Sequence, residues 1–307
     1  MKKELIIGDV TWIHLIEPTK KEIAALEEKY ELHELIVEYL TEVNTQHIIN
    51  QYDDHILIVF LFPKFQPNVW KYVLNEFTII LGKNYVITTT RFETNTVQKI
   101  MKEYQDELEE READENFKIS PYYILYKIID VLYDKMIIGL HKTSKELLFI
   151  EESVMLSKNL SKNILEQLMT KKLNMAHVKY TFQPQEEILD ELNEAVQKFY
   201  EGDLEVYFGD LQSKQKKIMT TSWFLFDTVN SLTDTYDGLM NIQTNGIIKT
   251  LTILTAMMWL FTLITWFYGM NMSVPLGGHP LWYLIVIGWM VIFGGLMAAV
   301  FRKKWRI

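Results

Sequence analysis

The chain has 307 residues, contains no cysteine and carries a formal net charge of −9. The absence of cysteine excludes disulfides and thiolate metal sites and leaves stability to core packing, as expected in a reducing compartment. All 40 acidic residues precede position 246, together with 26 of the 31 basic ones, and this acidic body argues against a nucleic-acid partner.

The first part of the chain alternates β-rich segments with helical ones. Strands are predicted at residues 4–7, 11–15, 48–52, 56–62, 72–81 and 85–90 from their β-branched and aromatic content. Pro63, Pro67 and the turn at 82–84 are predicted to end strands. Pro18-Thr19 opens one helix and a second covers roughly 32–41. The sequence therefore predicts an α/β layer.

Beyond Phe92 the pattern becomes helical. Proline is absent from 122–183 and again from 185–274, which permits very long helices. We expect one continuous stalk helix from about Val206 to Met270.

Two uncharged apolar runs follow. Leu251–Met270 and Leu281–Val300 are each 20 residues without Asp, Glu, Lys, Arg or His, and a helix of ~20 residues crosses ~30 Å of hydrocarbon. Basic residues flank the pair, at Lys249 and within 302–306, whereas the loop 271–280 has no charged residue. The positive-inside bias then predicts a multi-pass protein of the cell membrane with both ends in the cytoplasm.

Met1–Asp9 lacks a signal segment, so the N-terminal part of the chain is predicted to stay in the cytoplasm. The predicted divisions are an α/β domain (1–115), a helical region (116–205), a stalk helix (206–250), a first span (251–270), an external loop (271–280), a second span (281–301) and a basic tail (302–307).

The first span carries a mildly polar stripe. Thr252, Thr255 and Thr262 fall on one side of a helix, and that side extends back to Asn245 and Ile248 and forward to Asn271. Such a stripe is more often packing than pore, because threonine hydroxyls bond their own helix carbonyls. Two helices cannot enclose a water-filled path, so a pore requires a homo-oligomer in which the first span lines the axis.

Several segments resemble one known family in the same order along the chain. They are Thr11–Ile13, Leu81–Thr88, Leu125–Asp130, Lys249–Ile253, Tyr268-Gly269-Met270-Asn271 and Phe301–Trp305. With them the chain resembles the CorA-type magnesium transporters over nearly its whole length. A lone Gly-Met-Asn is weak evidence, but its position at the outer end of the first of two spans makes it specific.

The resemblance implies an α+β membrane protein that assembles as a funnel-shaped homopentamer in the lipid bilayer and conducts divalent cations. Gly269, Met270 and Asn271 would form the entrance, with Asn245, Ile248, Leu251, Thr255 and Thr262 lining the path and Lys303 and Lys304 forming a basic ring. Mg²⁺ sheds water reluctantly, so five neutral amides of Asn271 would bond its water shell without stripping it. Dewetting at Ile248 and Leu251 would gate the path.

Regulation by cytoplasmic Mg²⁺ is also implied. Asp210 matches a carboxylate that binds metal between subunits of the family, whereas its usual aspartate partner is replaced by Tyr39, with Glu38 as the candidate substitute. Two further departures are Trp266, where the family commonly has a small residue, and Trp259 at another pore-facing position. The direction in which these indoles face stays open, as does the possibility that Lys303 and Lys304 are only solvated.

The sequence also bears on three other functions. A membrane-anchored enzyme is not expected, because the chain has no His-Glu-x-x-His, P-loop or catalytic Ser or Cys motif. A zinc-transporting member of the same superfamily and a non-conducting tether remain alternatives. Met270 favours magnesium over zinc, since the zinc branch tends to carry isoleucine there, but it does not separate magnesium from cobalt or nickel, nor import from export.

Overall fold

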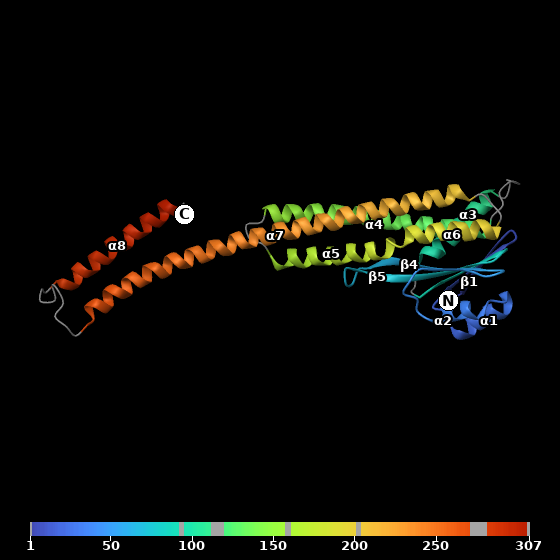
Figure 1. The fold of residues 1–307 in the computed structure, drawn as a ribbon, viewed down its shortest axis with the longest axis horizontal. Helices are drawn as coiled ribbons and strands as arrows, with labels where there is room; N and C mark the ends of the chain where they lie inside the picture. Colours follow the sequence, from blue (N-terminus) through green and yellow to red (C-terminus); the bar gives the residue numbers. More distant parts are fainter. Residues whose placement is uncertain are drawn as a thin grey trace. The chain divides into compact units, whose positions relative to one another are not determined.

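The computed structural model describes residues 2–91, 95–111, 120–156, 161–200, 204–270 and 281–305. The chain divides into two compact units, Met1–Asp234 and Thr235–Ile307. The first unit contains a sheet with helices on both faces, and the second contains the C-terminal part of one long helix together with the last helix (Figure 1).

The first unit is built on a six-stranded sheet of order β1-β2-β6-β5-β4-β3. Its strands are β1 (Lys2–Ile7), β2 (Val10–Ile16), β3 (Ile48–Gln51), β4 (Ile56–Gln66), β5 (Lys71–Leu81) and β6 (Tyr85–Thr90). Only β2 and β6 pair in parallel, and the other neighbours are antiparallel. The parallel pair needs a crossover connection, which the segments between β2 and β6 provide.

One face of the sheet is covered by α1 (Lys20–Tyr30) and α2 (Glu34–Thr41) (Figure 1). A capping box starts α1, since Thr19 Oγ1 accepts from the Glu22 N–H at 3.3 Å and the Glu22 carboxylate accepts from the Thr19 N–H at 2.8 Å. Side chains of both helices and the sheet form one buried cluster: Ile13, Leu15, Ile23, Leu26, Leu32, Ile36, Leu40, Leu57, Ile80 and Ile87.

The opposite face carries α3 (Asn95–Arg111), α4 (Pro121–Leu156), α5 (Lys162–Phe182) and α6 (Gln185–Tyr200) (Figure 1). Aromatic rings join this layer to the sheet: the ring centroid of Phe62 lies 5.9 Å from that of Tyr133 and 6.1 Å from that of Phe182. Gln185 is fully buried and bridges three elements, because its Nε2 donates to Leu61 O at 3.0 Å and its Oε1 accepts from Tyr133 Oη at 2.8 Å.

The predicted strands and the first two helices are confirmed, with one exception. Pro63 was predicted to end a strand, but β4 continues through it to Gln66. The pairing explains why: β3 pairs with β4 only from Ile56 to Val59, so Pro63 has a paired strand, β5, on one side only. Proline is tolerated where its missing N–H faces an open strand edge. Pro67 does lie in the turn that follows β4.

The longest element is α7 (Glu205–Tyr268), a single helix of 64 residues where a helix from about Val206 to Met270 was expected. Its part in the first unit buries a seam at alternating intervals of three and four, at Phe208, Leu211, Gln215, Ile218, Ser222, Leu225, Val229 and Leu232. This interval places the seam on one side of the helix. Gln215 Nε2 donates to Phe182 O at 2.9 Å, which ties α7 to α5.

The second unit contains the rest of α7 and α8 (Trp282–Trp305). Among the described residues, α7 is the one helix that meets a test of length and apolar composition for crossing a membrane, with a mean hydropathy of 1.9 over its most apolar window. Within α8 the described apolar stretch is Val286–Leu296. The second span therefore stays a prediction.

Candidate ion pathway

The predicted pore-lining residues lie on the second-unit part of α7, and a single chain leaves them uncovered. Ile248 is 54% and Leu251 61% exposed, and Asn245, Thr255 and Thr262 are exposed as well. Apolar side chains at this level of exposure are not part of a core in one chain, so they need lipid or other protein to cover them.

Helix geometry brings four of these residues to one face. At about 100° per residue, Ile248, Leu251, Thr255 and Thr262 fall within an arc of about 60°, whereas Asn245 lies about 60° from Ile248, outside that arc. We call this arc the open face. The contact between α7 and α8 lies on another side of α7, at Phe261. A Cβ added to Gly294 of α8 would lie 3.1 Å from the Cζ atom of Phe261.

The threonine hydroxyls all donate back to their own helix. Thr252 Oγ1 donates to Ile248 O at 2.8 Å, Thr255 Oγ1 to Leu251 O at 2.9 Å and Thr262 Oγ1 to Met258 O at 2.8 Å. The hydroxyl hydrogens are therefore used, and the oxygen lone pairs are left to accept. A hydrated cation presents outward-pointing water hydrogens, for which such oxygens are suitable partners.

The signature residues end α7. The Gly269 N–H donates to Thr265 O at 2.9 Å and to Trp266 O at 3.2 Å, which closes the last helical turn. A Cβ on Gly269 would lie 3.1 Å from that Thr265 oxygen, a tight contact that glycine avoids. Met270 is 52% exposed. Asn271 and the rest of the loop lie outside the described residues, as do the side chains of Lys303 and Lys304 at the end of α8.

The two candidate regulatory carboxylates do not meet within one chain. Glu38 is exposed on α2, whereas Asp210 lies in the second turn of α7, and the sheet separates the two helices (Figure 1). Tyr39 packs against the core cluster and is partly buried. Among the described residues, no group of three or more His, Asp or Glu side chains is arranged to hold a metal. A site that uses both carboxylates would need two subunits.

Asp210 already has a partner on α4. It accepts a hydrogen bond of 3.0 Å from Tyr126 Oη, and burial together with this bond raises the pKa of Tyr126 above its usual value. One turn further along α7, Lys214 pairs with Asp130 and, at 2.8 Å, with Asp134. The sequence predicted neither of these lysine contacts, although the i, i+4 spacing of Asp130 and Asp134 places the two carboxylates on one face of a helix.

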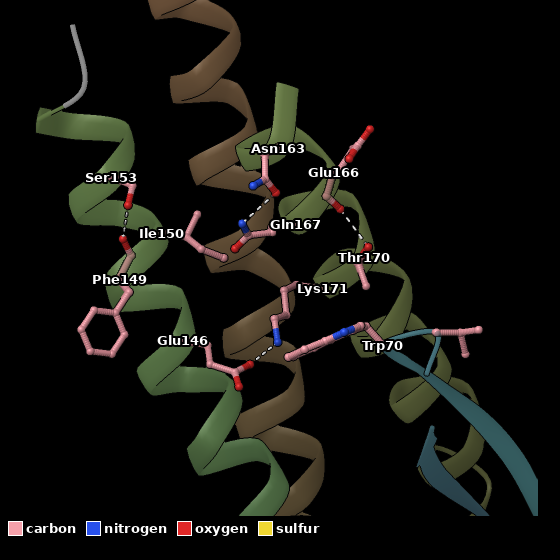
Figure 2. Close-up of a pocket in the computed structure, with 11 residues that line it drawn as sticks. Trp70, Glu146, Phe149, Ile150, Ser153, Asn163, Glu166, Gln167, Thr170 and Lys171 are labelled. Carbon is pink, nitrogen blue, oxygen red and sulfur yellow. Dashed lines mark hydrogen bonds and ion pairs between the residues drawn. The ribbon is translucent and has the colours of Figure 1, made fainter. Parts of the chain in front are cut away.

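A separate cavity of about 640 Å³ lies between α4 and α5, beside Trp70 of the turn between β4 and β5 (Figure 2). Its polar side chains are engaged within its own walls, since Lys171 pairs with Glu146 and Gln167 Nε2 donates to Asn163 Oδ1 at 3.1 Å. Ser153 and Thr170 each donate to a carbonyl of their own helix. Because these groups already have partners, this cavity offers little to a cation and is not part of the candidate pathway.

Comparison with known proteins gives a family over almost the entire chain. A family model described as CorA-like Mg²⁺ transporter protein matches residues 8–303. A curated relative, the cobalt/magnesium transport protein CorA of Thermotoga maritima, is 24% identical over 299 residues, which cover 96% of this chain and 82% of the relative.

Solved structures agree in fold. The complete structure of the CorA magnesium transporter from Methanocaldococcus jannaschii aligns with a TM-score of 0.79 at 20% identity and covers 97% of this chain and 92% of that one. The structure of the full-length CmaX protein aligns with a TM-score of 0.74 at 18% identity, over 97% and 90% of the two chains. The predicted combination of an α/β layer and a long helix is thus also the fold of these two full-length proteins.

Proposed function

Because the chain belongs to the CorA-like Mg²⁺ transporter protein family, we propose that it conducts hydrated divalent cations, Mg²⁺ first among them, through a homopentameric pore lined by α7. In this proposal the protein is a multi-pass protein of the cell membrane, both termini are cytoplasmic, and α8 is a second span outside the ring of α7 helices. The entrance is made by Gly269, Met270 and Asn271, and the path by Asn245, Ile248, Leu251, Thr255 and Thr262.

The observation that carries the proposal is the open face of α7. It is apolar at Ile248 and Leu251 and oxygen-bearing at Thr255 and Thr262, and nothing in the described part of the chain covers it. An apolar belt can dewet and gate, whereas threonine lone pairs can bond the water shell of a passing cation. Five copies of α7 around an axis would give each level of this face a ring of identical groups.

Feedback by cytoplasmic Mg²⁺ is the regulatory part of the proposal. Asp210 of one subunit and Glu38 of a neighbour would share the ion, and its loss would leave carboxylates repelling each other across the interface. Binding at Asp210 would compete with the Tyr126 hydrogen bond. Limited proteolysis of the full chain with and without millimolar Mg²⁺ tests this: protection by Mg²⁺ that is lost in Asp210→Ala supports it, and identical cleavage of the native chain in both conditions contradicts it.

The function itself is tested by cation uptake into vesicles that contain the purified protein and a Mg²⁺-sensitive dye. We expect uptake by the native chain, loss of uptake in Asn271→Ala, and native uptake in Asn193→Ala, which removes an amide from α6 instead. Competition with Co²⁺, Ni²⁺ and Zn²⁺ in the same assay orders the ions, and preferential Zn²⁺ uptake would favour the zinc-transporting alternative. Absence of divalent uptake from an intact oligomer would favour the tether.

A further inference from the structure

Two tryptophans lie at the Ile248 edge of the open face of α7. Trp259 is 74% and Trp266 77% exposed, and they follow Ile248 by 11 and 18 residues, which at about 100° per residue places both within about 20° of its direction. They alternate with the threonines, because Thr255, Trp259, Thr262 and Trp266 are spaced by four, three and four residues. The face that presents oxygen atoms therefore also presents two indoles.

A position at the membrane interface does not explain Trp259. Tryptophan is enriched at the two surfaces of the bilayer, where the indole N–H can reach water. Trp259 is about 12 Å along the helix from Leu251 and about 17 Å from Met270, near the middle of the predicted span. Within the described residues its indole nitrogen has no hydrogen-bond partner. In hydrocarbon that N–H would stay unsatisfied at a cost of a few kcal/mol, whereas a water-filled path would hydrate it.

We propose that Trp259 and Trp266 face the ion path as two indole rings that restrict the passage of the hydrated cation. This inference rests on the proposed function and adds the residues that set its rate. The two rings are about 10 Å apart along the axis, and the outer one lies two residues before the end of α7 at Tyr268.

The chemistry of the indole makes each ring a barrier. The water shell of a divalent cation presents hydrogens outward, and these are accepted by the amide oxygen of Asn271 and the lone pairs of Thr255 and Thr262. The indole N–H only donates, so it does not match that shell. Its bulk also narrows the path, and Mg²⁺ does not readily lose water to pass a narrow point. Each indole therefore slows a cation that the threonine levels accept.

The first test measures uptake by variants of the full chain. Trp266→Ala and Trp259→Ala are expected to raise Mg²⁺ uptake several-fold, because the barrier is removed, and Trp266→Phe, which retains an aromatic ring, is expected to raise it less. Trp289→Ala is the matched control, since it removes an exposed indole from α8. Uptake that is unchanged in both alanine variants but lost in Asn271→Ala overturns the indole rings and leaves the proposed function standing. Absence of uptake by the native chain overturns both.

The second test does not depend on transport. Because the native chain has no cysteine, Trp259→Cys and Trp289→Cys each introduce a single thiol. A charged, membrane-impermeant thiol reagent is expected to label the reconstituted Trp259→Cys chain and not the Trp289→Cys chain, and a bulky trivalent cation such as cobalt hexammine is expected to slow that labelling. No labelling at position 259, while the same reagent labels the denatured chain, would show that Trp259 does not face water and would overturn the proposal. Equal labelling of the two positions would also overturn it, because access to water would then not distinguish an ion path on α7 from the exposed side of α8.

Discussion

The buried side chain of Gln185 links α6 to β4 and α4 within the first unit, and its loss should destabilise that unit. Gln185→Leu removes the donor to Leu61 O and the acceptor of Tyr133 Oη, and both of those groups are left buried without the bond that they make now. An unsatisfied buried polar group costs about 1–3 kcal/mol, so the expected loss of stability is about 2–6 kcal/mol. Tyr133→Phe alone leaves one such group, the Gln185 amide oxygen, and is expected to cost about 1–3 kcal/mol.

The double variant tests whether the side chains of Gln185 and Tyr133 are energetically coupled. In Gln185→Leu with Tyr133→Phe only the Leu61 carbonyl loses its partner, so this protein is expected to be more stable than Gln185→Leu alone by about 1–3 kcal/mol. Thermal unfolding of the three variants and the native chain in one detergent, followed by circular dichroism, gives their order. Additive losses in the double variant would show that the hydroxyl and the amide are not coupled as the structure has them.

The remaining predictions concern pH and the path. Burial lowers the pKa of His14 from 6.5 to about 4, so between these values the unfolded chain binds a proton that the folded chain does not, and stability should fall as the pH drops through that window. Melting temperatures from pH 7 to pH 4 should show this decline, and His14→Phe should flatten it; an unchanged slope would contradict the assignment. Thr262→Val, which loses the acceptor oxygen, should reduce Mg²⁺ uptake in vesicles, whereas Thr262→Ser should retain it, and equal uptake by the two variants would remove Thr262 from the path.

Much of the first unit could be predicted because its signals are local. Thr19 and Glu22 at capping-box spacing start α1, and alternating β-branched residues mark the strands, whatever the rest of the chain does. Pro63 shows where local rules fail. Whether a proline ends a strand depends on whether a neighbour needs its missing N–H, and that is a property of the sheet, not of the segment.

Of the candidate site, the residues along α7 could be predicted from spacing, whereas contacts between distant segments could not. Helical spacing alone put Ile248, Thr255 and Thr262 on one side, and the structure keeps that arrangement because α7 is unbroken there. The contacts of Asp210 could not be predicted, because Tyr126 is 84 residues away in the sequence and meets it only when α4 and α7 pack. The role of Asn271 rests on the family signature.

The contrast between the two parts of α7 indicates why the proposed function needs an assembly. As far as Leu232 the helix buries a regular seam against its own unit, and that seam includes Gln215 and Ser222, which are polar. The most apolar window of α7 is instead not buried at all in a single chain. A sequence that buries polar residues in one half and leaves large apolar ones uncovered in the other is matched to two different surroundings. In the proposed pore the uncovered half meets lipid on some faces, whereas the threonine oxygens and the indole N–H groups at the open face meet water, so water and lipid lie on different sides of one helix. A ring of copies around an axis satisfies both demands.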